Sequence, residues 1–242
     1  MDEAKKVSIQ NIVDREIKKF ADSYEARFTN EVNDPEGVIN SKKNNCFVAE
    51  LGKEFMFYSA FVRSFDSSFG KVLEKIGNEV AKLSYDVRGN IDSFLLPQQS
   101  QHMDYIILEY EKHRKPMTSD YCDFTCMIPA DTRSFEKSHV TDHYFYNNEK
   151  NEHYLIELKA GGDLDNKKAK TEKLAMLQEY FILKNSLRDK PNDKIKLFLG
   201  TAYNKYGENS EWKQERVKQF FAEDELLIGK DYWNFVCDDP ED

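Results

Sequence analysis

Two short β-rich segments joined by a polar loop restrict the fold of this chain more than any other feature. Residues 142–147 read DHYFYN and residues 152–159 read EHYLIELK, with the loop NEKN between them. Two β-rich runs joined by a short loop that contains Asn are typical of an antiparallel hairpin. If Asn147 pairs with Glu152, the register places Asp142 directly opposite Glu157 at the other end of the hairpin.

The predicted register divides the side chains of the hairpin between two faces. Directly opposed residues of an antiparallel pair point to the same side, and side chains alternate along each strand. One face then holds Asp142, Tyr144, Tyr146, His153, Leu155, Glu157 and Lys159. The other face is apolar apart from a histidine at its end, and it holds His143, Phe145, Tyr154, Ile156 and Leu158. We expect the apolar face to pack against the rest of the protein.

Asp142, Glu157 and Lys159 are residues of the types that could carry out catalysis together. Two carboxylates held side by side repel each other, and a divalent cation such as Mg²⁺ bound between them relieves the repulsion. An ammonium group beside that cation can orient or deprotonate a water molecule and stabilise negative charge on a phosphate. The pattern predicts phosphodiester hydrolysis by a metal-activated water, with Asp142 and Glu157 as metal ligands and Lys159 positioning the water.

The tripeptide acidic-x-Lys carries little information by itself, because it occurs five times in the chain. Only the copy that begins at Glu157 ends an apolar strand, follows a hairpin with an opposed Asp, and precedes Gly-Gly and a lysine-rich segment. The competing interpretation is a surface hairpin whose charged side chains simply face solvent. Asp123 is an alternative catalytic Asp, since it too starts a predicted strand, and hairpin geometry favours Asp142.

The rest of the chain predicts an α/β (α+β) fold. Apolar residues recur at three- and four-residue steps over residues 2–32, which indicates an amphipathic helix. Further helices are predicted at 47–65, 69–83, 166–187 and 212–221, and further strands at 121–128 and 194–203. Residues 92–113 suit a helix or a strand, and we favour a helix. This order predicts a mixed central sheet with an antiparallel catalytic hairpin, flanked by helices.

Composition excludes several classes of protein. The chain has 35 Lys and Arg against 44 Asp and Glu, and a net charge of −9 is unlike that of a basic nucleic-acid coat or a polybasic membrane binder. Hydrophobic residues make up 40%, which is too many for a disordered chain, and the apolar runs are too short to span a membrane. The first residues, MDEAKKVS, contain no secretory signal, so we expect a cytoplasmic protein with no membrane partner.

The cysteines and histidines do not predict a zinc site. We expect reduced thiols at the four scattered cysteines, Cys46, Cys122, Cys126 and Cys237. His139 and His143 lie on a segment that looks extended, and a third ligand with suitable spacing is not evident. We therefore expect these two histidines to have core or DNA-contacting roles.

Asp142 together with residues 154–160, YLIELKA, resembles the active-site hairpin of the PD-(D/E)xK nuclease superfamily, especially of Type II restriction endonucleases. In that family an Asp at the start of one strand precedes Glu-x-Lys on the next, and Thr141 stands where the family often has Pro. The resemblance covers roughly residues 70–200. Residues 227–235, LIGKDYWNF, are also loosely similar to the C-terminal segment of several restriction enzymes. A restriction-endonuclease-like core is implied.

The resemblance also implies an organisation, a cofactor and partners. We expect a single nuclease domain over residues 1–242, with a helical part at 1–68, a catalytic core at 69–203 and a second helical part at 204–242. The implied cofactor is Mg²⁺, for which Mn²⁺ can substitute, and the implied assembly is a homodimer that cuts both strands of double-stranded DNA at a short site. Many members add an acidic residue from the helix before the hairpin, and Glu79 is a better candidate than Glu74.

The segment after the hairpin contains candidate DNA-binding residues. Gly161 and Gly162 indicate a tight turn or a close approach of DNA, and Asp163 or Asp165 is expected to cap the following helix. Basic and polar side chains in its first turns would lie near the site and hold a phosphate backbone, namely Asn166, Lys167, Lys168, Lys170 and Lys173. The alternative for each lysine is an ordinary solvated helix face.

We therefore expect a metal-dependent, sequence-specific DNA endonuclease of the Type II restriction class. One alternative is a relative with the same hairpin that acts in repair or defence with little sequence specificity. A second alternative is a non-catalytic DNA-binding module.

Overall fold

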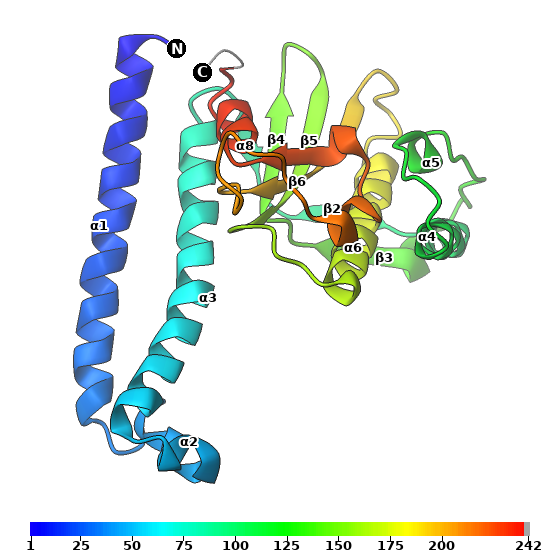
Figure 1. Ribbon diagram of the computed structural model, residues 1–242. Helices are drawn as coiled ribbons and strands as arrows, with labels where there is room; N and C mark the ends of the chain where they lie inside the picture. The colour runs from blue at the N-terminus through cyan, green and yellow to red at the C-terminus, as the bar shows by residue number, and fades with distance from the viewer. Residues whose placement is uncertain (240–242) are drawn as a thin grey trace. The chain divides into compact units, whose positions relative to one another are not determined.

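The computed structural model describes residues 1–239 of the chain and divides it into two compact units, Met1–Glu79 and Val80–Asp242. Figure 1 shows the first unit as a helical hairpin and the second as a mixed sheet with helices on both faces. Within the described residues, no helix combines the length and the apolar character needed to cross a membrane. The single-domain organisation stays a prediction.

The first unit is built from two long helices, α1 (Glu3–Asn33) and α3 (Lys53–Ala81). The last two residues of α3, Val80 and Ala81, belong to the second unit. A 3₁₀ helix, η1 (Asn40–Asn44), and the short helix α2 (Cys46–Glu50) connect them. Aromatic side chains of both helices interlock, and the hydroxyl of Tyr24 donates a 2.8 Å hydrogen bond to the carbonyl of Phe61. Amphipathic periodicity and aromatic packing thus form the core of this unit.

The prediction of separate helices at 47–65 and 69–83 is wrong. Residues 46–50 form α2, and α3 runs without interruption from Lys53 to Ala81. Gly70 lies inside α3, and a Cβ added there would meet nothing within 4 Å. A glycine in an open helical position costs only about 1 kcal/mol relative to alanine, so it does not break the helix.

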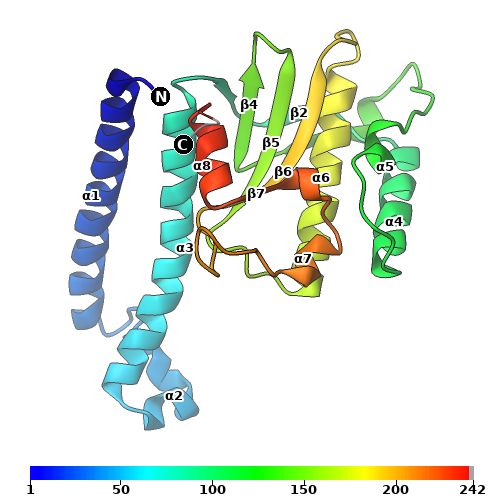
Figure 2. The ribbon, with the colours of Figure 1, turned by 45° about the horizontal axis from the view of Figure 1, so that its top comes forward.

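The second unit is organised around a five-stranded sheet with the order β1-β4-β5-β6-β7. Its strands are β1 (Asp86–Arg88), β4 (His143–Asn147), β5 (Glu152–Lys159), β6 (Lys194–Thr201) and β7 (Leu226–Ile228). β1, β4 and β5 are antiparallel, whereas β6 is parallel to both β5 and β7. Figure 2 shows the hairpin β4–β5 beside β6, and β1 pairs with the other edge of the hairpin. The predicted α/β fold with a mixed central sheet is confirmed.

The other elements of the second unit surround this sheet. A second, two-stranded sheet pairs β2 (Ile91–Phe94) with β3 (Glu136–His139). The helices are α4 (Pro97–Glu111), α5 (Ser119–Cys122), α6 (Asn166–Ser186), α7 (Glu215–Lys218) and α8 (Lys230–Val236), with 3₁₀ turns η2 (Arg133–Phe135) and η3 (Glu223–Glu225). The helix favoured within residues 92–113 is therefore present as α4, but β2 precedes it.

Both faces of the hairpin are buried, and not only the face predicted to be apolar. On one face, Tyr144 and Leu155 belong to a core cluster with residues of α6 such as Leu177. On the other face, Tyr154 packs edge-on against Phe235 of α8, with ring centroids 4.9 Å apart. The hairpin has this environment because it is central in the sheet, with a strand on each side and a helix on each face (Figure 2).

Two further predictions differ from the structure. Residues 121–128 do not form a strand: α5 ends at Cys122, and the carbonyls of Cys122 and Phe124 accept hydrogen bonds from Lys184 instead of pairing with a strand. The helix predicted at 212–221 is limited to α7, although Trp212 and Phe221 are buried. In both places the apolar residues contribute to the core without regular structure, so composition alone was misleading.

Candidate active site

The two carboxylates predicted to lie opposite each other come together at one end of the hairpin. The register is confirmed, because Asn147 pairs with Glu152 and His143 with Ile156. Asp142 directly precedes β4, and its Oδ2 accepts a 2.9 Å hydrogen bond from the backbone amide of Leu158. Since Leu158 follows Glu157, this bond holds the Asp142 carboxylate at the end of β5 that carries Glu157 and Lys159.

Lys159 lies between two carboxylates. Its Nζ is 2.5 Å from Oε1 of Glu157 on the same strand and 2.9 Å from Oε1 of Glu172 on α6. The three side chains remain accessible, with exposed fractions of 26% for Lys159, 16% for Glu157 and 25% for Glu172. The site is therefore shielded by the protein but open to a ligand from solvent.

Sequence reasoning missed Glu172. Glu172 lies about two turns into α6, among lysines that were predicted to bind DNA. Its distance of 13 positions from Lys159 becomes a contact only because α6 turns back and packs along β5. The signal that could have revealed it is an isolated acidic residue among the lysines of the first turns of a helix that directly follows Glu-x-Lys.

The electrostatics of the site disfavour two ionised carboxylates side by side. Burial, together with the negative charge of Asp142, raises the pKa of Glu157 to about 8. Burial also raises the pKa of Asp142, although the Leu158 amide and the Lys159 ammonium oppose this shift. Both pKa values are raised, and a cation bound between the two groups would offset the repulsion between their negative charges.

Lys159 has the opposite tendency. Burial acts to lower its pKa, but the charges and hydrogen bonds of Glu157 and Glu172 outweigh burial and raise the pKa above its usual value. The side chain is therefore an ammonium at neutral pH. An ammonium can donate hydrogen bonds and stabilise negative charge, but it cannot accept a proton from water.

The donor set at this end of the hairpin suits a hard divalent cation. Among residues 1–239, no group of three or more His, Cys, Asp or Glu side chains has an arrangement that would hold a metal by itself. Mg²⁺ does not need such a cage, because it keeps several waters and is typically bound by one or two carboxylates plus substrate phosphates. Asp142 and Glu157 meet that requirement.

The two glycines after β5 pack against the protein itself. Gly162 has φ +67°, and a Cβ there would lie 2.6 Å from the Thr201 methyl carbon. A Cβ on Gly161 would lie 2.6 Å from the hydroxyl oxygen of Tyr203. Both glycines are therefore required for a tight turn between β5 and α6, which explains why α6 returns so closely to the site.

The candidate DNA-binding residues at the start of α6 have different environments. Asp165 caps the helix, accepting a 2.8 Å hydrogen bond from the amide of Lys168. The side chains of Asn166, Lys167 and Lys168 are exposed. Lys170 forms an ion pair of 2.7 Å with Glu111 of α4.

Lys173 does not face solvent. It is fully buried and paired with the buried Glu225, which also accepts a 2.7 Å hydrogen bond from the hydroxyl of Tyr121. The expectation that Lys173 would help to hold a phosphate backbone is therefore wrong. Its role is to connect α6 to the segment that contains η3.

The other acidic candidates lie elsewhere in the chain. Glu79 ends the first unit, where its Oε2 lies 3.8 Å from Nη2 of Arg15. Asp123 follows α5 as its C-terminal cap and does not start a strand. The roles of both residues in the site stay predictions.

The two histidines before and in β4 separate into two roles. His143 is fully buried, and its Nε2 lies 2.8 Å from the hydroxyl of Tyr232. Burial lowers the pKa of His143 to about 3, so it is a neutral core residue. His139, at the end of β3, is 30% exposed and lies beside Glu179 of α6.

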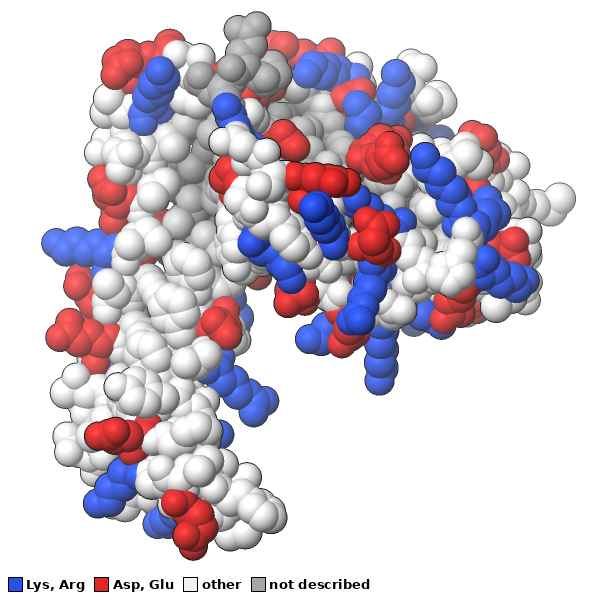
Figure 3. Space-filling model, viewed as in Figure 1, with Lys and Arg blue, Asp and Glu red and all other residues white. Residues whose placement is uncertain are grey.

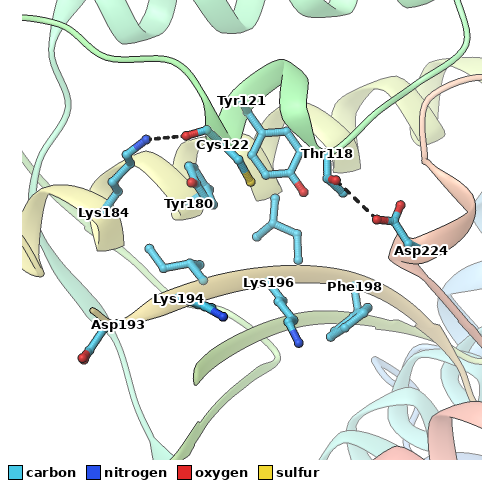
Figure 4. A pocket seen from close by; sticks show the side chains of 12 residues that line it. Thr118, Tyr121, Cys122, Tyr180, Lys184, Asp193, Lys194, Lys196, Phe198 and Asp224 are labelled. Atoms are coloured by element: carbon cyan, nitrogen blue, oxygen red, sulfur yellow. Dashed lines mark hydrogen bonds between the residues drawn. The ribbon is translucent and has the colours of Figure 1, made fainter. Parts of the chain in front are cut away.

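A separate cavity of about 610 Å³ lies between α5, α6 and β6 (Figure 4). Lys184 reaches across it to the carbonyl of Cys122, and Thr118 donates a 3.3 Å hydrogen bond to Asp224. None of Asp142, Glu157 and Lys159 lines this cavity. It is therefore distinct from the candidate active site.

Charged side chains are mixed on the face of the second unit seen in Figure 3, where Lys and Arg alternate with Asp and Glu. This distribution agrees with the net charge of −9. On this face, no large basic patch would attract nucleic acid without regard to sequence.

The comparisons with known proteins agree with this geometry. The family model for HinfI, a Type II restriction endonuclease, matches residues 5–241. No curated protein and no solved structure matches the chain. Because the family model spans nearly the whole chain, the protein belongs to the HinfI family of Type II restriction endonucleases.

Proposed function

We propose that this protein is a Mg²⁺-dependent, sequence-specific endonuclease that hydrolyses phosphodiester bonds in double-stranded DNA. The observation that carries the proposal is the meeting of Asp142, Glu157 and Lys159 at one end of the central hairpin. Membership of a restriction endonuclease family supports DNA as the substrate. We expect the enzyme to act in the cytoplasm, where the DNA of an invading element would be met.

Asp142 and Glu157 are the proposed metal ligands, with Mn²⁺ as a substitute for Mg²⁺. The bound cation would supply a water of lowered pKa and charge balance for the phosphate. Asp142 contributes a carboxylate whose direction is fixed by the Leu158 amide. Glu157 contributes a second carboxylate, whose pKa is raised first by burial and then by the negative charge of Asp142, and a cation would offset that charge.

Lys159 acts as an ammonium in this proposal. It donates hydrogen bonds that orient the attacking water, and it stabilises the negative charge that develops on the phosphate. Since its pKa is raised, we do not assign it the role of general base. Glu172 is a positioning residue, because it binds Lys159 from α6, whereas Glu157 binds Lys159 from the same strand, β5.

DNA would be held by the exposed start of α6, through Asn166, Lys167 and Lys168, with Lys170 released from Glu111. Each chain contributes one catalytic hairpin, whereas cutting a duplex requires the hydrolysis of two strands. We therefore propose a homodimer in which the two sites act on opposite strands of a twofold-symmetric sequence. Sedimentation of the chain should then give twice its mass of 28.4 kDa.

The experiment that tests this function is a digest of a long defined DNA with Mg²⁺, comparing the wild type with Glu157→Ala. We expect discrete fragments from the wild type and none from the variant, with circular dichroism showing that the variant is folded. Glu152→Ala is a matched control, because Glu152 starts the same strand but pairs with Lys196 away from the site. A smear of fragments would indicate a non-specific nuclease, and equal activity in Glu157→Ala would contradict the proposal.

A further inference from the structure

His139 at the end of β3 and Glu179 on α6 form a second pair of basic and acidic side chains. The Nδ1 of His139 lies 2.9 Å from Oε1 of Glu179. Glu179 is only 2% exposed, and its Oε2 has no hydrogen-bond partner among the described residues. A buried carboxylate is stable only beside a positive charge or a donor, and His139 is the basic group beside it.

The pair repeats the arrangement at Lys159. Glu172 and Glu179 are seven residues apart on α6, which places them on the same face of the helix two turns from each other. Glu172 binds Lys159 of β5, and Glu179 binds His139 of β3. One helix face therefore supplies an acidic partner to a basic side chain of each of the two sheets.

His139 is close to the catalytic end of the hairpin. Asp142 is three positions further along the chain, and three residues of extended chain span at most about 10 Å. Glu179 raises the pKa of His139 against the effect of burial, and the backbone of Val140 and the charge of Glu157 add smaller contributions in the same direction. The imidazole is therefore a cation over a wider pH range than a free histidine.

The exposed part of His139 is available to a ligand. Glu179 lies on the Nδ1 side of the ring, and 30% of the His139 side chain is exposed. The next residue, Val140, is 73% exposed, so solvent reaches this edge of the protein. The buried Glu179 fixes the ring from behind, as an acidic partner does for a histidine whose other nitrogen binds a ligand.

We propose that His139 binds a phosphate of the DNA backbone next to the scissile one, through Nε2, with Glu179 as its positioning residue. Phosphates recur about every 3.4 Å of helix axis on each strand, so a strand bound at Asp142 and Glu157 has neighbouring phosphates within reach of His139. The imidazolium at the end of β3 adds a positive charge to those of the lysines at the start of α6. This inference rests on the proposed function only in taking DNA as the ligand.

The test is the salt dependence of DNA binding, measured by fluorescence anisotropy with a short duplex of mixed sequence. Ca²⁺ replaces Mg²⁺ so that the duplex stays intact, and the pH is kept below 6.5 so that the imidazole is charged. Each lost phosphate contact reduces the slope of log K against log salt by about 0.9, so His139→Gln should reduce it by about 1.8 in a dimer. His139→Lys should restore the slope, because it restores the charge.

A purely structural role for His139 predicts a different result. In that case His139→Gln lowers the melting temperature but leaves the salt slope of the wild type unchanged, and this outcome would overturn the inference. Lys112→Gln is the matched control for the loss of one positive charge, since Lys112 pairs with Glu109 on α4. A wild type that fails to bind DNA would contradict the proposed function, so the two failures are distinguishable.

A second measurement needs no variant and covers the case in which His139→Gln does not fold. The titration of His139 is followed by nuclear magnetic resonance in the wild type, with and without the duplex. Contact with a phosphate should raise the pKa of His139 further, whereas the buried His143 and His153 serve as internal references. An unchanged His139 titration in the complex would overturn the inference.

Discussion

The carboxylate of Asp142 accepts a hydrogen bond of 2.9 Å from the backbone amide of Leu158. This bond crosses the hairpin at the point where the strand pairing ends, between the residue before β4 and the residue that separates Glu157 from Lys159. The bond fixes the side chain of Asp142, the residue predicted to lie opposite Glu157, although Asp142 is not itself part of β4. A backbone donor is insensitive to side-chain identity, so the geometry is a property of the hairpin itself.

Asp142→Asn should abolish most of the cleavage while the protein stays folded. The amide oxygen of Asn can still accept the Leu158 hydrogen bond, but the negative charge at the proposed metal site is lost. Loss of a residue that only supports a metal ligand typically costs up to about 100-fold in activity. Because Asp142 is proposed to bind the metal directly, we expect the cleavage rate to fall by at least that much. The measurement is the initial rate of DNA cleavage at saturating Mg²⁺.

Asp123→Asn is the comparison for this prediction, because Asp123 was the alternative catalytic Asp. Its position at the end of α5 predicts a rate close to that of the wild type. Strong loss of activity in Asp123→Asn together with normal activity in Asp142→Asn would contradict the assignment.

Glu172→Gln should lower kcat with little effect on KM. The variant removes one of the two carboxylates that hold Lys159, so the ammonium spends less time in its working position. A loss of about 10- to 100-fold is expected from such a positioning residue. Steady-state kinetics on a duplex that contains the site gives both constants, and Glu215→Gln on α7 is a control for a surface glutamate. A change confined to KM would argue against a role through Lys159.

The sequence predicts the hairpin well because its signals are local. Side chains alternate over 142–147 and 152–159, the polar loop fixes the register, and both features act within 18 residues. The helix from Asn166 is equally local, with its periodicity and the Asp165 cap. These elements are enough to predict the mixed sheet and the meeting of Asp142 with Glu157.

The contacts of α6 could not be predicted in the same way. Glu172, Lys173 and Glu179 are charged residues of one helix, yet they contact Lys159, Glu225 and His139 in three different parts of the unit. Which lysine is buried and which is exposed depends on how α6 packs on the sheets. The strands β1 and β7 have three residues each, which is too short for an alternation to be seen.

The buried ion pair of Lys173 and Glu225 should be important for stability. Both side chains are at most 1% exposed, and Tyr121 and the amide of Ala222 also donate to Glu225. Lys173→Met leaves a buried carboxylate without its cation, which should cost about 3–5 kcal/mol in the free energy of unfolding. Urea denaturation measures this loss.

The double variant Lys173→Met, Glu225→Leu should be more stable than Lys173→Met alone, since it removes the unpaired charge as well. If the single variant is as stable as the wild type, the buried pair does not have the role that its burial indicates.

Acid should destabilise the protein through His143. Its pKa is about 3 in the folded state, because of burial, and 6.5 in an ordinary setting. The contribution is fully present above pH 6.5 and is lost as the pH falls towards 3, because the unfolded chain binds the proton first. The free energy of unfolding should therefore fall by up to about 1.4 kcal/mol per pH unit from this group.

Urea midpoints measured at several pH values below 6.5 check this prediction. His143→Gln should be less stable than the wild type at neutral pH, where it loses the contact with Tyr232, but its stability should depend less on pH. Identical pH slopes for the wild type and His143→Gln would show that another group is responsible.

The most direct test of this catalytic centre is a digest of a long defined DNA by the wild type and by Lys159→Ala, each with and without Mg²⁺. We expect discrete fragments only from the wild type with Mg²⁺, while Lys159→Ala binds the same DNA and does not cut it. Cleavage by the wild type without any divalent cation, or by Lys159→Ala at the rate of the wild type, would contradict the claim that this hairpin is the catalytic centre.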